Sequence, residues 1–481
     1  MHDIPTSITQ YFAPLPDPRV AHTKRHRLLD ILTIALCAVI CGADDFVGMV
    51  TFAETKHAWL RTFLPLPGGI PCHDTFGRVF AALDPEAFQA CFLAWVRAAV
   101  PSTVGQVVAI DGKTLCGAHA RGRGQAALHM VSAWASGSRL VLGQVAVAEK
   151  SNEITAIPAL LRVLDLAGAT VTNDALGCQT AIAARIVAHG ADYILALKKN
   201  HPTLHEEVEA TFTRERKEAF ADTPPGTWDY CKAVGKDHGR LETRQHWVLR
   251  DPGLLAYLNP TGAWANLHAI ALVERQRQVG DHPPTCERHY YLLSAPLSAQ
   301  AFAAGVRSHW GIENRVHWLL DVTFSEDACR VRAGHAARNF AVIRHLALNL
   351  LPQDATRTGS LAKKRFTAAR DDTYLSTPPR LGTPPHICPP LRCNRPEERH
   401  GTVDNVVFPT AVDAREGAHR RLLRDGRRAH RPPAPARPAD VTGPGAAWHP
   451  AVREGSVVLC GDDRNGPAVR HACINTLGTA S

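Results

Sequence analysis

The stretch Val107-Val108-Ala109-Ile110-Asp111 is short and fully apolar up to its last residue, which is a carboxylate. This composition predicts a buried β-strand that ends at Asp111. Outward from it, the apolar pattern predicts two further strands, a helix, a strand, a helix and a last strand, at 128–135, 140–147, 157–166, 169–172, 179–189 and 192–197. The order β-β-β-α-β-α-β predicts an α/β core.

The regions on either side of this core have different patterns. Residues 1–100 carry apolar stretches at helical spacing, which predicts a small helical domain. Residues 203–300 interrupt the alternation, and their strand-like stretches between Pro- and Gly-containing loops predict an insertion rich in antiparallel β-structure. Helical patterns return at 298–320 and 336–351.

The overall composition is that of a globular protein. Apolar residues make up 45% of the 481 residues and charged residues 21%, which excludes a collagen, a coiled coil and a fully disordered chain. A formal net charge of +9 favours a polyanionic partner. The 13 Cys are scattered without a CxxC motif, which favours a reduced cytoplasmic protein over a zinc ribbon. The most apolar run, 31–43, is shorter than the roughly 20 residues that cross a bilayer.

Residues 376–481 differ from the rest of the chain. They are rich in Pro and Arg and contain no Lys, which predicts a disordered tail. Arg, Pro, Gly and Ala are also the residues that GC-rich DNA encodes when it is read out of frame. A frameshift near residues 372–378 is therefore our hypothesis for the tail, and a genuine basic arm is the alternative.

Three carboxylates stand at places where a metal site could form. Asp111 and Asp174 end predicted strands of one core, and Glu313 lies on the helix that follows the insertion. Strand ends converge at one sheet edge, and a helix packed on the sheet can add a third group. Three such groups can hold two Mg²⁺ ions about 4 Å apart for displacement at phosphorus. The ordinary alternatives are a turn at Asp111, a helix cap at Asp174 and a solvated Glu313.

Several longer sequence motifs surround these residues. In order they are 69–76 (GIPCHDTF), 109–113 (AIDGK), 149–153 (EKSNE), 174–179 (DALGCQ), 238–240 (HGR), 309–314 (HWGIEN), 317–318 (HW), 321–324 (DVTF) and 326–327 (ED). With these motifs, residues 10–375 resemble the insertion-sequence transposases that carry a DDE triad, and most closely the H-repeat-associated type.

The resemblance implies a fold and an activity. Residues 104–375 would form a ribonuclease H-like catalytic domain with the β-rich insertion, preceded by a helical accessory domain at 1–100. Asp111, Asp174 and Glu313 would be the catalytic, metal-binding triad. Mg²⁺, or Mn²⁺ in its place, would support cleavage at the element's ends and strand transfer into target DNA. A homodimer on paired ends is implied, in the bacterial cytoplasm and on the nucleoid when bound to DNA, with no membrane and no nucleotide cofactor.

Several basic residues near the triad are candidates for DNA contacts. Where many related transposases have Arg, this chain has His309, with Arg307 nearby. Phosphate contacts from such residues would give affinity and position rather than sequence choice. The full candidate set is Lys113, Lys198, Lys199, Arg240, Arg307, His309 and Arg315.

Other residues on the Glu313 helix have competing interpretations. Asp321 is the alternative to Glu313 as third ligand. His309, Glu313 and His317 form a row at helical spacing that could bind a transition metal, but the His-Glu-x-x-His signature of zinc hydrolases is absent. Trp310 and Trp318 share one ridge, and we expect core packing for them rather than base stacking.

Two other functions remain open from the sequence alone. An inactive DNA-binding remnant of a transposase would keep binding without turnover. A stand-alone Mg²⁺-dependent nuclease would cleave without joining.

Overall fold

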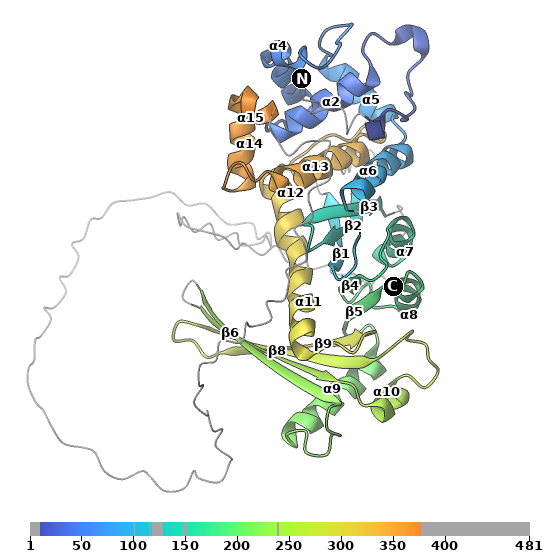
Figure 1. Ribbon diagram of the computed structural model, residues 1–481, viewed down its shortest axis with the longest axis vertical. Helices are drawn as coiled ribbons and strands as arrows, with labels where there is room; N and C mark the ends of the chain where they lie inside the picture. Colours follow the sequence, from blue (N-terminus) through green and yellow to red (C-terminus); the bar gives the residue numbers. More distant parts are fainter. Residues whose placement is uncertain are drawn as a thin grey trace, which may run out of the picture. The chain divides into compact units, whose positions relative to one another are not determined.

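The computed structural model describes residues 10–100, 102–115, 117, 128–147, 152–237 and 240–376. The tail predicted from residue 376 onward lies outside these residues apart from residue 376 itself. In the described part, strands join in one mixed sheet with the order β3-β2-β1-β4-β5-β9-β8-β7-β6 (Figure 1).

The predicted β-β-β-α-β-α-β order of the core is confirmed. Its elements are β1 (Val107–Leu115), β2 (Leu128–Ala135), β3 (Leu140–Ala146), α7 (Glu153–Val163), β4 (Thr170–Asn173), α8 (Thr180–Ala188) and β5 (Asp192–Leu197). β1 is antiparallel to β2 and parallel to β4, and β4 is parallel to β5. The prediction that β1 ends at Asp111 is wrong. The strand continues to Leu115 because its pairing with β2 extends as far as Leu115 opposite Leu128.

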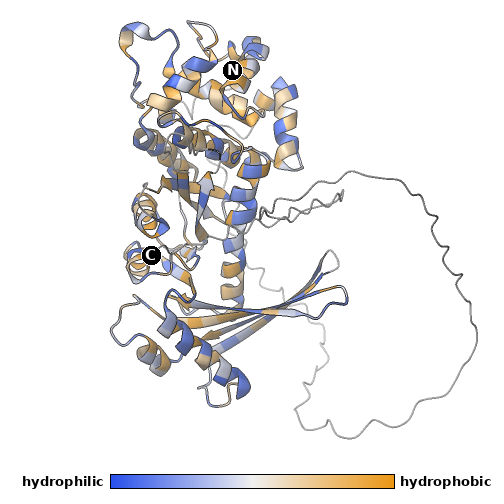
Figure 2. Ribbon diagram, turned by 180° about the vertical axis from the view of Figure 1, so that it is seen from behind, coloured by the Kyte–Doolittle hydropathy of each residue, from blue (hydrophilic) through white to orange (hydrophobic). Residues whose placement is uncertain are grey.

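The predicted insertion is β-rich and antiparallel, but it extends the core sheet rather than forming a sheet of its own. It contains α9 (Pro202–Lys217), β6 (Trp228–Asp237), β7 (Arg240–Leu249), α10 (Pro252–Leu258), β8 (Ala269–Val279) and β9 (Thr285–Leu293). β9 pairs with β5 and so joins the two parts. The last residues of β7 and the first of β8 are buried, whereas their other halves are partly exposed and more hydrophilic (Figure 2).

A long helical segment lies against the sheet and carries Glu313. It runs through α11 (Ala299–Ile312), the π-helical segment η4 (Glu313–His317) and α12 (Trp318–Val322). α11 packs on β1, β4, β5, β6 and β7 (Figure 1). Two glycines allow this close approach, because a Cβ on Gly305 would lie 2.6 Å from Ile194 and one on Gly311 would lie 2.4 Å from Trp134.

The helices at the two ends of the described chain form one layer. The N-terminal elements are η1 (Ala21–Thr23), α2 (Leu28–Ile40), α3 (Phe46–Thr55), α4 (His57–Leu60), α5 (His73–Ala82) and α6 (Pro85–Ala99). They are followed much later by α13 (Ala336–Gln353), α14 (Leu361–Arg370) and α15 (Asp372–Ser376). α13 packs on α2, α5 and α6, so the first hundred residues share a hydrophobic core with residues beyond 335.

The last part of the predicted helical domain, residues 73–99, is divided between the two helices α5 and α6. Asp84 caps α6 by accepting a hydrogen bond from the Glu86 backbone, and Pro85 occupies the first turn of the helix. Within the described residues, no single helix is long and apolar enough to cross a membrane. α5 and α6 meet that criterion only together, across a bend of 91°.

Candidate metal and DNA site

Asp111 and Asp174 are neighbours because of the register of two parallel strands. The pairing of β1 with β4 ends at Ile110 opposite Asn173. The next residue on each chain is an aspartate, and adjacent strands lie about 4.8 Å apart. The two carboxyl groups therefore lie at the same edge of the parallel part of the sheet.

Two ordinary roles considered for these aspartates are not the ones observed. Asp111 lies inside β1 and does not open a turn. The N-cap of α8 is Gln179. Asp174 instead accepts hydrogen bonds from the backbone of Leu176 at 2.9 Å and of Gly177 at 3.3 Å, which orders the turn that follows β4.

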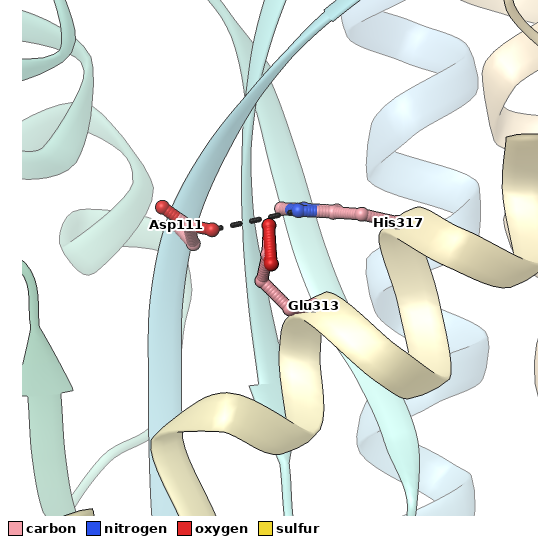
Figure 3. Close-up of side chains that lie close together, drawn as sticks. All are labelled: Asp111, Glu313 and His317. Atoms are coloured by element: carbon pink, nitrogen blue, oxygen red, sulfur yellow. Dashed lines mark ion pairs between the residues drawn. The ribbon is translucent and has the colours of Figure 1, made fainter. Parts of the chain in front are cut away.

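The helical segment adds two ligand-type side chains opposite Asp111. Ligand atoms of Asp111, Glu313 and His317 all lie within 4.8 Å of one another (Figure 3). His317 Nδ1 is 3.4 Å from Asp111 Oδ2. Glu313 is exposed, whereas His317 is buried. From the sequence, His317 was considered as part of a possible transition-metal row with His309 and Glu313, and not as a partner of Asp111. Its spacing of four residues from Glu313 was the available signal.

Within the described residues, the carboxylates of Asp111, Asp174 and Glu313 lack a paired positive charge to balance them. Burial, then the charge of Asp174, and then Glu153 and Glu313 raise the pKa of Asp111 to about 8. Burial also raises the pKa of Asp174. In the described part of the chain, neither Lys nor Arg forms an ion pair with any of the three carboxylates of the expected triad. Oxygen ligands lacking a cationic partner fit a divalent metal ion.

A fourth carboxylate lies beside the site. Glu153 Oε1 is 2.7 Å from His129 Nε2, and His129 Nδ1 shares a hydrogen bond of 2.8 Å with the Thr114 hydroxyl. A Cβ on Gly112 would lie 2.2 Å from Glu153 Oε1. Gly112 thus lies against the side chains of Glu153 and His129, which would have to shift to admit a Cβ at this position.

Lys113 occupies a different environment from a surface cation. Its Nζ lies 2.7 Å from Asp321, 3.0 Å from Asp327 and 3.5 Å from Glu326, and its side chain is 10% exposed. Burial alone would lower the pKa of Lys113, but the neighbouring carboxylates, Glu326 first, raise it to about 12. Asp321 therefore forms an ion pair with Lys113, and it does not belong to the group formed by Asp111, Glu313 and His317.

His309 also differs from a free cation. Its Nδ1 shares a hydrogen bond of 2.9 Å with the Thr172 hydroxyl on β4. Burial lowers the pKa of His309 to about 4, so the imidazole is neutral at pH 7. It can meet a phosphate as a hydrogen-bond donor but not as a positive charge.

The remaining basic candidates lie after β5, on the helical segment and on β7. Lys198 and Lys199 follow β5 and are exposed, and the charge of Lys198 partly opposes the rise that burial causes in the pKa of Asp174. Arg307 on α11 and Arg315 on η4 are exposed, and Arg240 begins β7 half-buried.

The expectation that Trp310 and Trp318 pack in the core is wrong. Trp310 is 56% exposed and Trp318 is 47% exposed. The helix turns Ile312, Val316 and Leu320 inward in their place. Helical spacing put both tryptophans on one ridge, but it could not tell which ridge faces the sheet.

Family comparisons agree with the geometry. A family model described as "Transposase DDE domain" matches residues 102–350, and one described as "DDE_Tnp_1-associated" matches residues 9–96. This chain belongs to the DDE-domain transposase family, as the resemblance indicated.

Particular relatives come from bacteria. The "H repeat-associated putative transposase YhhI" of Escherichia coli (strain K12) is 37% identical over 373 residues, which cover 77% of this chain and 97% of the relative. The "Putative transposase YncI" of Escherichia coli O157:H7 is 37% identical over 371 residues, 77% of this chain and 93% of the relative. An "Uncharacterized protein in dhlA 3'region" of Xanthobacter autotrophicus is 45% identical over 286 residues, 59% of this chain and 93% of the relative.

Proposed function

We propose that this chain is a DNA transposase that cuts the ends of an insertion sequence and joins them to target DNA. The observation that supports this most is that Asp111 lies at one sheet edge with Asp174 and also close to Glu313, while none of the three has a Lys or Arg ion-pair partner among the described residues. Mg²⁺ is our first choice of metal, with Mn²⁺ as the alternative, because these ligands are oxygens.

We further propose that residues 104–375 form a ribonuclease H-like catalytic domain and that residues 1–100 are an accessory domain. The antiparallel β3-β2-β1 followed by the parallel β4 and β5 supports the first part. The packing of α11 across these strands supports it further, because α11 leads directly into Glu313.

In this proposal, the chain's residues hold and orient the reacting groups. Asp111 is close to both Asp174 and Glu313, since, besides its burial, the charge of each raises its pKa, and it would therefore help to hold both metal ions. When bound, the ions would make a water molecule nucleophilic and neutralise the leaving 3′-oxygen. The turn at Leu176 and Gly177 holds the Asp174 carboxylate in place, and β1 holds that of Asp111.

The DNA backbone would follow the exposed cations around this edge. Arg307 lies near Arg244 and Arg275, since both Arg307 and Arg275 lower the pKa of Arg244 after its burial does. Glu242 pairs with Arg244, and Glu287 pairs with Arg275. Arg307 is therefore the member of this group that we propose as a phosphate contact. Lys198, Lys199, Arg240 and Arg315 complete the proposed contacts, with His309 as an uncharged donor. Lys113 leaves this set because three carboxylates already engage its ammonium group.

The exposed tryptophans add a second kind of DNA contact. Trp310 precedes Glu313 by three residues, so an unpaired base near the cleaved bond could stack on its ring. Substitution of Trp310 by Ala should weaken binding of end DNA with unpaired bases, and it should change duplex binding less.

We also propose that two protomers, one for each element end, act together.

A strand-transfer assay tests the proposal. Its substrate is end DNA taken from inverted repeats that flank the gene, incubated with the full chain, Mg²⁺ or Mn²⁺ and target plasmid. Joined product is expected, and it should disappear in Asp111→Asn, Asp174→Asn and Glu313→Gln. Asp222→Asn, an exposed aspartate after α9, is the matched control and should join normally. Cleavage without joining would indicate a nuclease, and a shifted but uncut duplex would indicate an inactive remnant.

A further inference from the structure

We infer that His317 is a nitrogen ligand to one of the two metal ions, which rests on the metal requirement of the proposed function. One ion would then be bound by Asp111, Glu313 and His317, and the other by Asp111 and Asp174. The two sites would differ in chemistry, since the first has a nitrogen ligand and the second has only oxygen ligands from the protein.

The geometry of His317 carries this inference. Its imidazole points toward the carboxylates of Asp111 and Glu313 (Figure 3). The side chain is 10% exposed, and Nδ1 lies 3.4 Å from Asp111 Oδ2. Nε2 is buried and has no hydrogen-bond partner among the described residues. Nδ1 is thus the ring nitrogen that faces Asp111, and it is the atom that would bind the ion.

The neighbouring histidines do not share this arrangement. His309 is engaged by Thr172, and His129 is held on both sides by Thr114 and Glu153. His317 alone, among the histidines of the described chain, belongs to a group of three ligand-type side chains within 4.8 Å.

The π-helical turn explains how two ligands reach one point. Glu313 and His317 are the first and last residues of η4, and π-helical turns are frequent at functional sites. The widened turn places the carboxylate and the imidazole toward the same position on β1, where Asp111 lies.

A nitrogen ligand has a consequence for metal preference. Mg²⁺ binds oxygen ligands almost exclusively, whereas first-row transition ions accept imidazole readily. Removing the imidazole should therefore lower Mn²⁺ affinity by about tenfold or more and lower Mg²⁺ affinity less.

Pulsed electron paramagnetic resonance of bound Mn²⁺ tests the inference without relying on activity. The full chain with less than one equivalent of Mn²⁺ should show coupling to ¹⁴N of histidine, and the coupling should change to that of ¹⁵N when the protein contains ¹⁵N-histidine. His317→Gln should lose the coupling, whereas His309→Gln should keep it. Asp111→Asn should lose Mn²⁺ binding, which locates the ion.

Three results would overturn the inference. They are Mn²⁺ bound in an Asp111-dependent manner without nitrogen coupling, coupling that survives His317→Gln, and coupling that His309→Gln removes. Each of these would leave the proposed function intact. Absence of cleavage and joining, with nitrogen coupling present, would instead contradict the proposed function and support the ligand assignment. The labelled wild-type protein gives an answer even if His317→Gln fails to fold.

Discussion

Two groups of carboxylates each include one residue of the same helical segment, Glu313 in one and Asp321 in the other, and they differ in what balances their charge. Asp321, Glu326 and Asp327 surround Lys113, and Glu326 also lies 3.8 Å from Arg344. We call these residues the paired group. Asp111, Asp174 and Glu313, the unpaired group, have no ion pair with Lys or Arg in the described residues.

The strand β1 supplies a residue to each group. Asp111 and Lys113 are two residues apart, so their side chains point to the same face, toward the helical segment. The paired group ties β1 to the residues after Glu313, and the unpaired group remains available for a cation. Carboxylates of the same type thus have different roles. Those beside Lys113 form ion pairs, and those without a Lys or Arg partner among the described residues remain available for a cation.

The largest effect on stability is expected for Lys113→Met. It would leave the buried Glu326 with only Arg344 at 3.8 Å and the half-buried Asp321 without its cation. Breaking a buried ion pair typically costs about 3–5 kcal/mol. Urea unfolding measures this loss, and Lys113→Arg, which keeps the charge, should lose much less. Equal losses in the two variants would contradict a role based on charge.

The next effect concerns activity. Asp111→Asn should lower cleavage by about 10²–10³-fold, because an ionic ligand that stabilises the transition state is lost. In the absence of metal, its thermal stability should equal or exceed that of the wild type, since a carboxylate without a cation is removed. A variant that lost activity only by unfolding would refute the distinction between the two groups.

A smaller loss of stability is expected at the contact of Gly112 with Glu153 and His129. Gly112→Ala places a methyl group on Glu153 and His129, and crowding of this kind costs about 1–3 kcal/mol. Calorimetry measures the loss in melting temperature. Gly235→Ala, where a Cβ would meet nothing within 4 Å, is the matched control and should change little.

The smallest effect is a pH dependence of stability caused by Asp354. Like Glu326, this carboxylate has a basic partner, since Lys364 lies 3.8 Å away. Burial alone would raise the pKa of this carboxyl group, but hydrogen bonds from Thr356 and Tyr374 and the charge of Lys364 hold it below its ordinary value. The stabilisation is therefore complete above about pH 3.9 and is lost as the pH falls through the lower, folded-state pKa.

Comparison with Asp354→Asn measures this contribution. The wild type should be more stable by about 1–2 kcal/mol near pH 6, and the difference should shrink toward pH 3. A difference that stays constant with pH would show that the carboxylate charge does not contribute.

The core elements could be predicted from the sequence because their causes are local. The alternating strands and helices and the end of β4 at Asn173 are visible as short apolar runs. The end of β1 is not, because its pairing with β2 carries the strand on to Leu115. β6 was missed because its residues are mostly exposed or half-buried and show no clear alternation.

The roles of single polar residues were harder to predict. Lys113 stands next to Asp111 in the sequence, which suggested a DNA contact, but its partners lie more than 200 residues later. The place of His317 beside Asp111 likewise depends on how α11 packs on β1. Local spacing does not contain this information, because long-range packing decides it.

The central claim is that the unpaired group exists to bind divalent metal, and metal-dependent stability tests it most directly. The melting temperature of the full chain should rise with Mn²⁺ or Mg²⁺, corresponding to about 2.7 kcal/mol at a hundredfold excess over the dissociation constant. The double variant Asp111→Asn with Glu313→Gln should show no rise, whereas Asp222→Asn should match the wild type. An equal rise in the double variant would contradict the claim.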